Sequence, residues 1–274
     1  MMHLLHKKAS HQVDKRIEPA STPAVALHET KLKIYGERNS GTTYLRQLLA
    51  ANVQATLLPG TAPRIWRRLA RGQEWPIDLY FHLTAAKNLG WKHQLVLPPT
   101  RGRSAHYARP GVKFIVITKN PYAWLLSLFR HPYHYQGQRS NFETFLQQPW
   151  ATVRRENHPQ PFANPIAMWN AKHEAYLRLL RQQEGVLLRY EALLADPEAQ
   201  LTHLTKTLQL TCHPYFIPVQ NDAKGESVRK FSDYQIYYLE QHWRQELDAR
   251  HIDLINRTLN QNLVTSMGYE LLSA

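Results

Sequence analysis

The chain has 274 residues, of which 43% are hydrophobic and 20% are charged, and this balance excludes a largely disordered or fibrous protein. The 34 Lys and Arg residues exceed the 21 Asp and Glu residues by 13, so an anion is expected among the ligands or surfaces that the protein meets. The lone cysteine, Cys212, excludes an intramolecular disulfide, and no apolar run approaches the roughly 20 residues of a membrane span. We therefore expect a cytoplasmic protein.

Residues 1–29 are rich in His, Lys, Ala and Pro and contain no apolar stretch of the kind that signal peptides carry. We expect them to form a disordered tail. From residue 30 onward the chain shows neither an internal repeat nor a linker rich in Gly or Ser. Residues 30–274 are therefore expected to form a single domain.

Short apolar runs alternate with segments of helical periodicity along the rest of the chain. Strands are expected at residues 32–35, 88–93, 112–118 and 185–189. Helices are expected directly after Asn120-Pro121, over most of the chain beyond residue 189, and at residues 43–53, 142–148 and 165–183. The rest of the segment 131–165 is expected to be irregular. Strands that alternate with helices predict an α/β fold, in which a parallel sheet is flanked by helices.

The segment from Gly36 to Thr43 reads Gly-Glu-Arg-Asn-Ser-Gly-Thr-Thr, and it joins the first expected strand to the first expected helix. Successive backbone N–H groups at such a place can hold a phosphate. The spacing matches the P-loop pattern except that Thr42 occupies the place of its lysine. Nucleoside triphosphatases use that lysine on the β- and γ-phosphates beside magnesium, so Thr42 argues against ATP or GTP and against a metal. A well-capped turn without a ligand is the alternative interpretation.

The run from Ser40 to Leu45 resembles the 5′-phosphosulfate loop of the sulfotransferases that use 3′-phosphoadenosine 5′-phosphosulfate. Residues 35–45 are similar to the bacterial and plant branch of that family. The resemblance implies a sulfotransferase fold with a P-loop-like sheet, and it implies that the donor's 5′ group is held by Arg38, Asn39, Ser40, Gly41, Thr42, Thr43 and Tyr44. Family members usually carry Lys or Arg directly before the serine, where this chain has Asn39. Another cation, such as Arg38, would then support the leaving phosphate.

A second anion motif follows the apolar run at 112–118. It consists of Lys119, a proline at 121 and Ser127, eight residues after the lysine. The family resemblance implies that Lys119 and Ser127 bind the donor's 3′-phosphate, at a site distant from the first loop. Lysine here keeps the charge of the commoner arginine but loses its bidentate geometry. An ordinary helix start with a solvated serine is the alternative.

Two looser similarities extend the resemblance toward the C-terminus. The stretch from Leu187 to Leu193 is similar to the family's strand and Tyr-Glu turn, which implies that Tyr190 lies beside the adenine. The segment around Lys224 and Gly225 sits where the family carries a basic loop over the 3′-phosphate. A core aromatic residue and a plain surface turn are the respective alternatives.

Transfer of a sulfuryl group to a hydroxyl requires a base that takes the acceptor proton. His93 is the first candidate, because it ends the strand expected at 88–93 and would emerge at the same sheet edge as the loop. The family resemblance also implies a histidine base here, with Lys92 or Arg38 stabilising the departing phosphate. Glu37, inside the loop, is the rival base, although a solvated loop carboxylate is its simpler interpretation.

The expected activity is therefore metal-free, in-line sulfuryl transfer to an acceptor hydroxyl. The basic and aromatic segments at 56–83, 97–110 and 131–165 are expected to select the acceptor, and their composition fits a carbohydrate or glycolipid. Peripheral contact with an anionic membrane surface is compatible with the charge, whereas no nucleic acid is expected as a partner. A P-loop phosphotransferase and a non-catalytic protein that binds polyanions or nucleic acid are the alternatives. The oligomeric state stays open.

Overall fold

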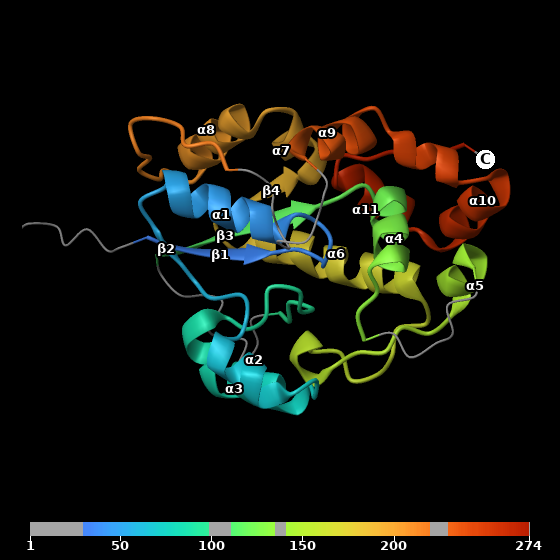
Figure 1. Ribbon diagram of the computed structural model, residues 1–274, viewed down its shortest axis with the longest axis horizontal. Coiled ribbons are helices and arrows are strands. Elements are labelled where there is room, and N and C mark those ends of the chain that lie inside the picture. The colour runs from blue at the N-terminus through green and yellow to red at the C-terminus, as the bar shows by residue number, and fades with distance from the viewer. Residues whose placement is uncertain (1–29, 99–110, 135–140, 220–229, 274) are drawn as a thin grey trace, which may run out of the picture.

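The computed structural model describes residues 30–98, 111–134, 141–219 and 230–273. The sheet contains four parallel strands in the order β2-β1-β3-β4 (Figure 1). Their bounds are Lys31–Tyr35 for β1, Thr56–Leu57 for β2, Val112–Thr118 for β3 and Gly185–Arg189 for β4. The expected α/β fold with a parallel sheet flanked by helices is thus confirmed.

Helices follow the strands and cover both faces of the sheet (Figure 1). They are α1 (Thr42–Asn52), α2 (Arg64–Ala70), α3 (Trp75–Asn88), α4 (Pro121–Arg130), α5 (Phe142–Gln147), η2 (Arg154–Glu156), α6 (Pro165–Gln182), α7 (Tyr190–Ala195), α8 (Pro197–Thr207), α9 (Phe231–Leu239), η3 (His242–Glu246), α10 (Ala249–Thr258) and α11 (Gln261–Ser266). None of these helices, all within the described residues, is both long enough and apolar enough to cross a bilayer.

The continuous apolar run of β3 is explained by burial on both faces. Ile115 and Ile117 belong to the large core cluster that contains the apolar side of α1. Phe114 and Val116 point the other way, into a second cluster with Tyr176 and its neighbours on α6. A strand covered by helices on both faces is apolar along most of its length, which is why residues 114–117 do not alternate with polar ones.

The strand expected at residues 88–93 does not form. Helix α3 continues to Asn88, and the chain then reverses through Leu89 and Gly90, which have positive φ values of 59° and 78°. Residues 91–93 are irregular but still lie beside the end of β1, because the Gly36 N–H donates to the Lys92 carbonyl at 3.0 Å. The apolar residues of this stretch therefore reflect burial against the sheet edge rather than membership of the sheet.

Three other parts of the prediction fall outside the described residues. They are the tail over residues 1–29, the basic residues between 99 and 110, and the loop that contains Lys224 and Gly225. Within the described residues, the chain between β2 and β3 holds the two helices α2 and α3. Figure 1 shows this hairpin on the opposite side of the sheet from α8, projecting away from the strands.

Candidate functional site

The loop after β1 is built around tight backbone approaches. A Cβ atom at Gly36 would lie 2.4 Å from the carbonyl oxygen of Ile117, so only glycine lets β1 end this close to β3. Asn39 and Gly41 have positive φ values of 64° and 85°, which curl the chain into the start of α1. The first intrahelical bond runs from the Leu45 N–H to the Gly41 carbonyl. The Ser40 N–H donates to the Glu37 carbonyl at 3.2 Å, whereas the N–H groups of the first turn of α1 have no intrahelical acceptor and are available to an anion.

Ser40 carries a buried hydroxyl group in this loop. Its side chain is fully buried, yet its Oγ has no hydrogen-bond partner among the described residues. Thr43 is nearby in sequence and accepts a bond from Lys92 Nζ at 3.3 Å. The side chain of Tyr44, in contrast, is buried against Phe231 with ring centroids 5.7 Å apart, so it belongs to the packing of α1. A buried hydroxyl without a hydrogen-bond partner, in a loop that resembles a phosphate-binding loop, fits a ligand that supplies acceptor oxygens.

Asn39 joins the loop to α4. Its Nδ2 atom lies 3.5 Å from the Ser127 carbonyl oxygen and 3.4 Å from that of His131, at the C-terminal end of the helix. The residue in the place of the family's usual loop cation therefore contacts α4 carbonyls. The neighbouring Arg38 supplies a cation one position earlier.

Arg38 is held by aromatic rings. Its guanidinium carbon lies 4.3 Å from the ring centroid of Tyr133 and 5.2 Å from that of Trp91. The indole N–H of Trp124 donates to the backbone carbonyl oxygen of Arg38 at 2.8 Å. Burial lowers the pKa of Arg38, although a guanidinium keeps its charge at neutral pH. The loop thus has an oriented cation that forms no ion pair with a carboxylate of the described residues.

His93 is fixed by the loop itself. Its Nδ1 forms a short hydrogen bond with the carbonyl oxygen of Gly36, and its ring packs edge-on against Trp91 at 4.9 Å. A carbonyl only accepts, so Nδ1 carries the proton and Nε2 is left as the basic nitrogen. Burial first, and then the positive charge of Lys92, hold the pKa of His93 well below its usual range. The imidazole is therefore neutral at pH 7, as a general base must be.

Lys92 lies between His93 and the first turn of α1. It is 8% exposed, and Gly60 approaches it so closely that a Cβ there would be 2.8 Å from the Lys92 Cβ. Burial and the charges of Arg38 and Arg46 lower the pKa of Lys92 to about 8. The ammonium is still mostly charged at pH 7 and close to the hydroxyl of Thr43.

A second cluster forms where β3, α4, α7 and α9 meet. Lys119 Nζ lies 4.3 Å from the ring centroid of Tyr190 and 4.0 Å from that of Tyr238. The Tyr238 hydroxyl is 3.0 Å from Ser127 Oγ. Burial raises the pKa of Tyr238, but the charge of Lys119 and hydrogen bonds with Lys119 and Ser127 outweigh burial and leave the pKa below its usual value. The cluster therefore combines a buried ammonium with two hydroxyl groups.

The two clusters meet at Tyr190. A Cβ on Gly41 would lie 2.4 Å from the Tyr190 ring, so this ring packs directly on the loop glycine while its face meets Lys119. The expected second anion site stays a prediction, and its residues lie on the other side of the Tyr190 ring from the first loop. The sheet order explains this, because β1 and β3 are neighbours and their parallel strands end at the same edge.

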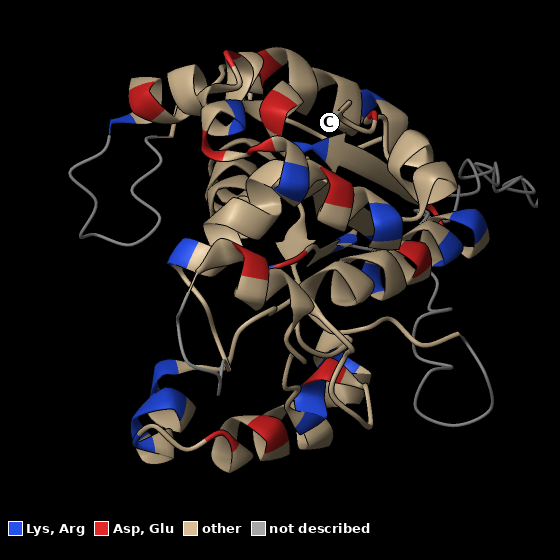
Figure 2. Cartoon of the chain, turned by 90° about the vertical axis from the view of Figure 1, so that its right-hand side faces the viewer, with Lys and Arg blue, Asp and Glu red and all other residues tan. Residues whose placement is uncertain are grey.

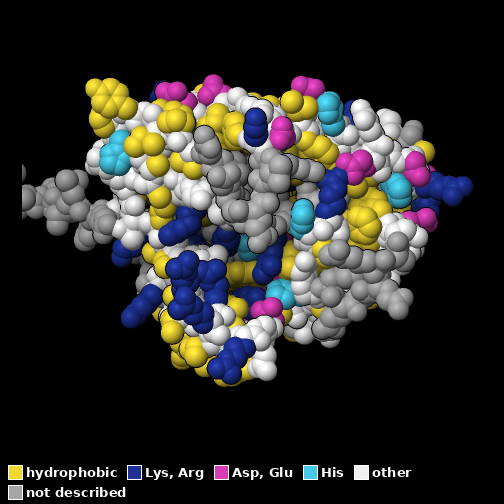
Figure 3. Space-filling view, in the orientation of Figure 1, with side chains coloured by type: hydrophobic (Ala, Val, Ile, Leu, Met, Phe, Trp, Pro, Cys, Tyr) yellow, Lys and Arg dark blue, Asp and Glu magenta, His cyan; other side chains and the backbone are white. Residues whose placement is uncertain are grey.

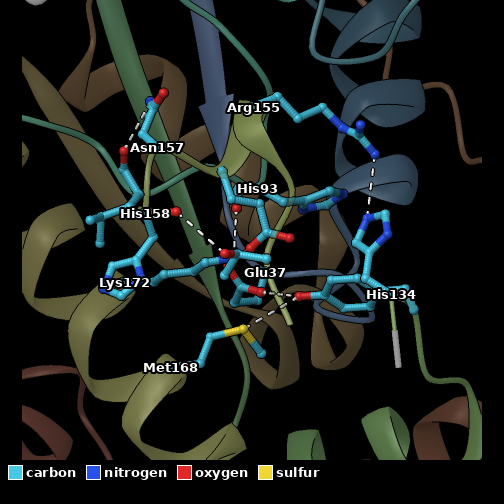
Figure 4. Close-up of polar contacts among 12 residues, drawn as sticks. Glu37, His93, His134, Arg155, Asn157, His158, Met168 and Lys172 are labelled. Carbon is cyan, nitrogen blue, oxygen red and sulfur yellow. Dashed lines mark hydrogen bonds and ion pairs between the residues drawn. The ribbon is translucent and has the colours of Figure 1, made fainter. Parts of the chain in front are cut away.

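Glu37 lies in a buried ionic network with Lys172 (Figure 4). Lys172 Nζ lies 3.0 Å from Glu37 and 2.8 Å from Glu156, and all three side chains are fully buried. The hydroxyls of Tyr133 and Tyr176 donate to the Glu37 carboxylate at 2.9 and 3.3 Å. Burial raises the pKa of Glu37, and Lys172 only partly offsets this effect. One ammonium between two buried carboxylates favours a structural role for Glu37 over the role of base.

Sequence reasoning missed Tyr238 and Lys172. Tyr238 is 111 residues from Ser127 in the chain, and Lys172 is 79 residues from His93, whose carbonyl oxygen it bonds at 2.9 Å. Neither residue stands in a local motif, and both occupy helices whose periodicity explains them as packing residues. Within the part of the chain that the structure describes, no group of three or more His, Cys, Asp or Glu residues could hold a metal ion.

No protein-family model and no curated protein matches this sequence. Among solved structures, one similar chain is described as "Sulfotransferase Domain from the Curacin Biosynthetic Pathway". The two chains share 14% sequence identity with a TM-score of 0.46, over 89% of this chain and 99% of the other. At this level the similarity does not bear on activity, so the functional conclusion depends on the side chains described above.

Proposed function

We propose that this protein transfers a sulfuryl group from 3′-phosphoadenosine 5′-phosphosulfate to an acceptor hydroxyl of a carbohydrate or glycolipid. The observation that carries the proposal is Lys119. It is 3% exposed, and no carboxylate among the described residues lies within ion-pair distance of it. A buried ammonium without a counter-ion is costly, and a phosphate supplied by a ligand would compensate it.

The residues around Lys119 fit a 3′-phosphate. Ser127 and Tyr238 bring hydroxyl groups to the same place, while Tyr190 separates this cluster from the loop that begins α1. A nucleotide with phosphates at both ends of its ribose matches two anion sites on either side of one aromatic ring. A nucleoside triphosphate, whose charges lie in a single chain, leaves Lys119 unpaired.

In the proposed reaction the acceptor oxygen forms a bond to sulfur while the bond from sulfur to the 5′-phosphate oxygen breaks. The acceptor proton passes to Nε2 of His93, whose other nitrogen is held by Gly36. Backbone N–H groups of the loop, Arg38 and Lys92 stabilise the negative charge that develops on the departing phosphate. The step needs no metal ion, because two cations already face the loop.

Nucleotide binding tests the donor assignment. We expect adenosine 3′,5′-bisphosphate to raise the melting temperature far more than adenosine 5′-monophosphate or ATP with magnesium, because stabilisation follows the affinity for the folded state. Lys119→Met should abolish this preference, whereas Lys113→Met, at a lysine within β3 whose Nζ pairs with Glu184, should keep it. Equal shifts with all three nucleotides would contradict the proposal, and a response restricted to ATP with magnesium would favour a phosphotransferase.

Transfer itself is tested with radiolabelled donor and a panel of sugars, glycolipids, phenols and peptides. Label should appear in a hydroxyl-bearing acceptor, and turnover should survive a strong chelator. If EDTA abolished turnover and magnesium restored it, the metal-free mechanism would be wrong. If the bisphosphate bound no better than a short oligonucleotide, the protein would be a polyanion binder.

A further inference from the structure

The α2–α3 hairpin has an outer surface that differs from the rest of the described chain. Five large hydrophobic side chains on it are between 39% and 64% exposed, namely Ile65, Leu69, Trp75, Leu79 and Leu83. Only five other large hydrophobic residues among the described ones are exposed to a comparable degree, and they are spread from residue 97 to residue 239. Exposed apolar groups gathered on one element indicate an interaction surface.

The exposed apolar residues are arranged in a stripe. Trp75, Leu79 and Leu83 follow one another at intervals of four, which places them on one side of α3. The opposite side of α3 is buried, and Tyr80 packs there against Trp66 of α2 with ring centroids 5.7 Å apart. The apolar stripe is therefore not needed for packing within the hairpin.

The neighbouring helix of the hairpin, α2, carries exposed arginine residues. Arg64, Arg67, Arg68 and Arg71 are all exposed, and Figure 3 shows Lys and Arg side chains gathered over α2 with hydrophobic side chains beside them. The two acidic residues of α3 and its N-cap do not neutralise them. Glu74 and Asp78 are paired instead with Arg155, at 2.6 and 2.8 Å.

We infer that the outer surface of the α2–α3 hairpin binds the surface of an anionic lipid bilayer. Exposed Trp and Leu side chains next to arginines are the combination that interfacial helices use, with apolar groups at the acyl boundary and guanidinium groups at lipid phosphates. A soluble polyanion would engage the arginines but leave the stripe of Trp75, Leu79 and Leu83 in water. In Figure 2 the hairpin stands apart from the sheet, so it can approach a flat surface.

The hairpin is also connected to the candidate site. Arg155, which holds Glu74 and Asp78, lies over Trp91 at 4.8 Å, and Trp91 contacts His93. A bilayer bound to the hairpin would therefore lie on the side of His93 where Trp91 and Arg155 pack. This part of the inference rests on the proposed function and favours an acceptor hydroxyl carried on a lipid.

Binding of the full chain to vesicles tests the inference. Sedimentation with phosphatidylcholine vesicles that contain phosphatidylglycerol should retain the protein, whereas pure phosphatidylcholine should retain little. Replacing Arg64, Arg67 and Arg68 with Ser should weaken binding on the order of 100-fold, since each arginine near an anionic surface contributes about one tenfold step or somewhat less. The matched control replaces three arginines exposed elsewhere, Arg181, Arg250 and Arg257, with Ser, and should bind normally.

The apolar half of the surface needs its own pair of variants. Trp75→Ser combined with Leu83→Ser should reduce binding even in high salt, where the arginine contribution is screened. Tyr215→Ser combined with Ile236→Ser, at exposed residues elsewhere, is the control. Urea denaturation of every variant reports whether the fold is intact, and adenosine 3′,5′-bisphosphate binding is measured beside it.

Several results would overturn the inference. They are absence of vesicle binding by the unaltered chain, equal losses in hairpin and control variants, binding of an oligonucleotide but not of vesicles through the same arginines, and self-association that disappears in the Trp75 and Leu83 variant. Loss of bisphosphate binding with intact vesicle binding would overturn the proposed function alone. Bisphosphate binding without vesicle binding would overturn only the membrane inference.

Discussion

His93 and Glu37 are the two residues between which the sequence could not choose as the base. The Gly36 carbonyl fixes the tautomer of His93, whereas Glu37 is occupied by Lys172, Tyr133 and Tyr176. His93→Ala should therefore lower turnover by about 10²–10⁴-fold, the usual contribution of a general base, and leave bisphosphate affinity nearly unchanged. Steady-state kinetics and calorimetric titration of the same preparation measure the two quantities. A variant with near-normal turnover would remove His93 from the mechanism.

Glu37→Gln provides the contrasting case. The amide keeps the shape of the side chain but leaves Lys172 with one carboxylate partner, Glu156. We expect the free energy of unfolding to fall by about 1–3 kcal/mol, the range for a disturbed buried polar contact. Turnover per folded molecule should change less than tenfold. A collapse of turnover at unchanged stability would instead make Glu37 the base.

Lys92 has a pKa that burial and neighbouring arginines lower to about 8. The protonated fraction therefore falls as pH rises through 8, and with it the positive charge beside the loop. Turnover should decline along this limb of the pH profile. Lys92→Arg, which keeps the charge in this range, should remove the decline. The measurement is turnover at saturating donor between pH 7 and pH 9. If turnover of the arginine variant declined with pH as steeply as that of the unaltered protein, Lys92 would be excluded from charge stabilisation.

At the scale of elements, the loop between β1 and α1 depends on Gly41. Gly41 and Gly72 share a φ of +85°, but a Cβ at Gly41 would meet the Tyr190 ring at 2.4 Å, while at Gly72 nothing lies within 4 Å. Alanine at either position pays the backbone strain of roughly 1–2 kcal/mol. Gly41→Ala should in addition displace Tyr190 and weaken bisphosphate binding at least tenfold, whereas Gly72→Ala should bind normally. Equal affinities in a calorimetric comparison would show that Tyr190 does not border the nucleotide.

Elements with strong local signals were predicted well. The continuous apolar run of β3 and the Asn120-Pro121 helix start, where Asn120 accepts from the Tyr122 N–H, are both present. The strand expected at residues 88–93 was wrong, because the positive φ values of Leu89 and Gly90 turn the chain there. Helices α2 and α3 were not anticipated, since an exposed apolar stripe hides the periodicity by which amphipathic helices are recognised.

At the scale of the molecule, the site is assembled from contacts that no local pattern contains. The motifs of the first loop and of Lys119 could be read from the sequence, because each is contiguous. Their junction at Tyr190 and the placement of Tyr238 against Ser127, 111 residues away, depend on strand order and helix packing. The assignments of individual site residues remain predictions until the variants are measured.

Stability should also depend on pH through buried histidines. Burial lowers the pKa of His173 to about 3, and the pKa of His93 lies well below its usual value for the same reason. The unfolded chain then binds more protons below the ordinary histidine value of about 6.5, so stability is highest above that pH and falls as pH decreases below it.

Between pH 6.5 and pH 5, the contribution of His173 to this loss should steepen toward about 1.4 kcal/mol per pH unit, the limiting slope for one proton. His173→Gln should therefore flatten the dependence of the free energy of unfolding on pH by that amount, as measured by urea denaturation. His203→Gln, at an exposed residue, is the control and should follow the unaltered protein. If the free energy of unfolding of the two variants depended on pH equally, the assignment of this pH dependence to His173 would be contradicted.

The contact between Gly41 and Tyr190 has an evolutionary consequence. The ring occupies the space where any other residue at position 41 would place its Cβ. Substitutions at position 190 are then tolerated when the new side chain is smaller than tyrosine. A substitution of Gly41 is tolerated only after such a change at position 190. The two positions should therefore covary among descendants of this chain, and the order of the substitutions should be the same in every lineage that makes both.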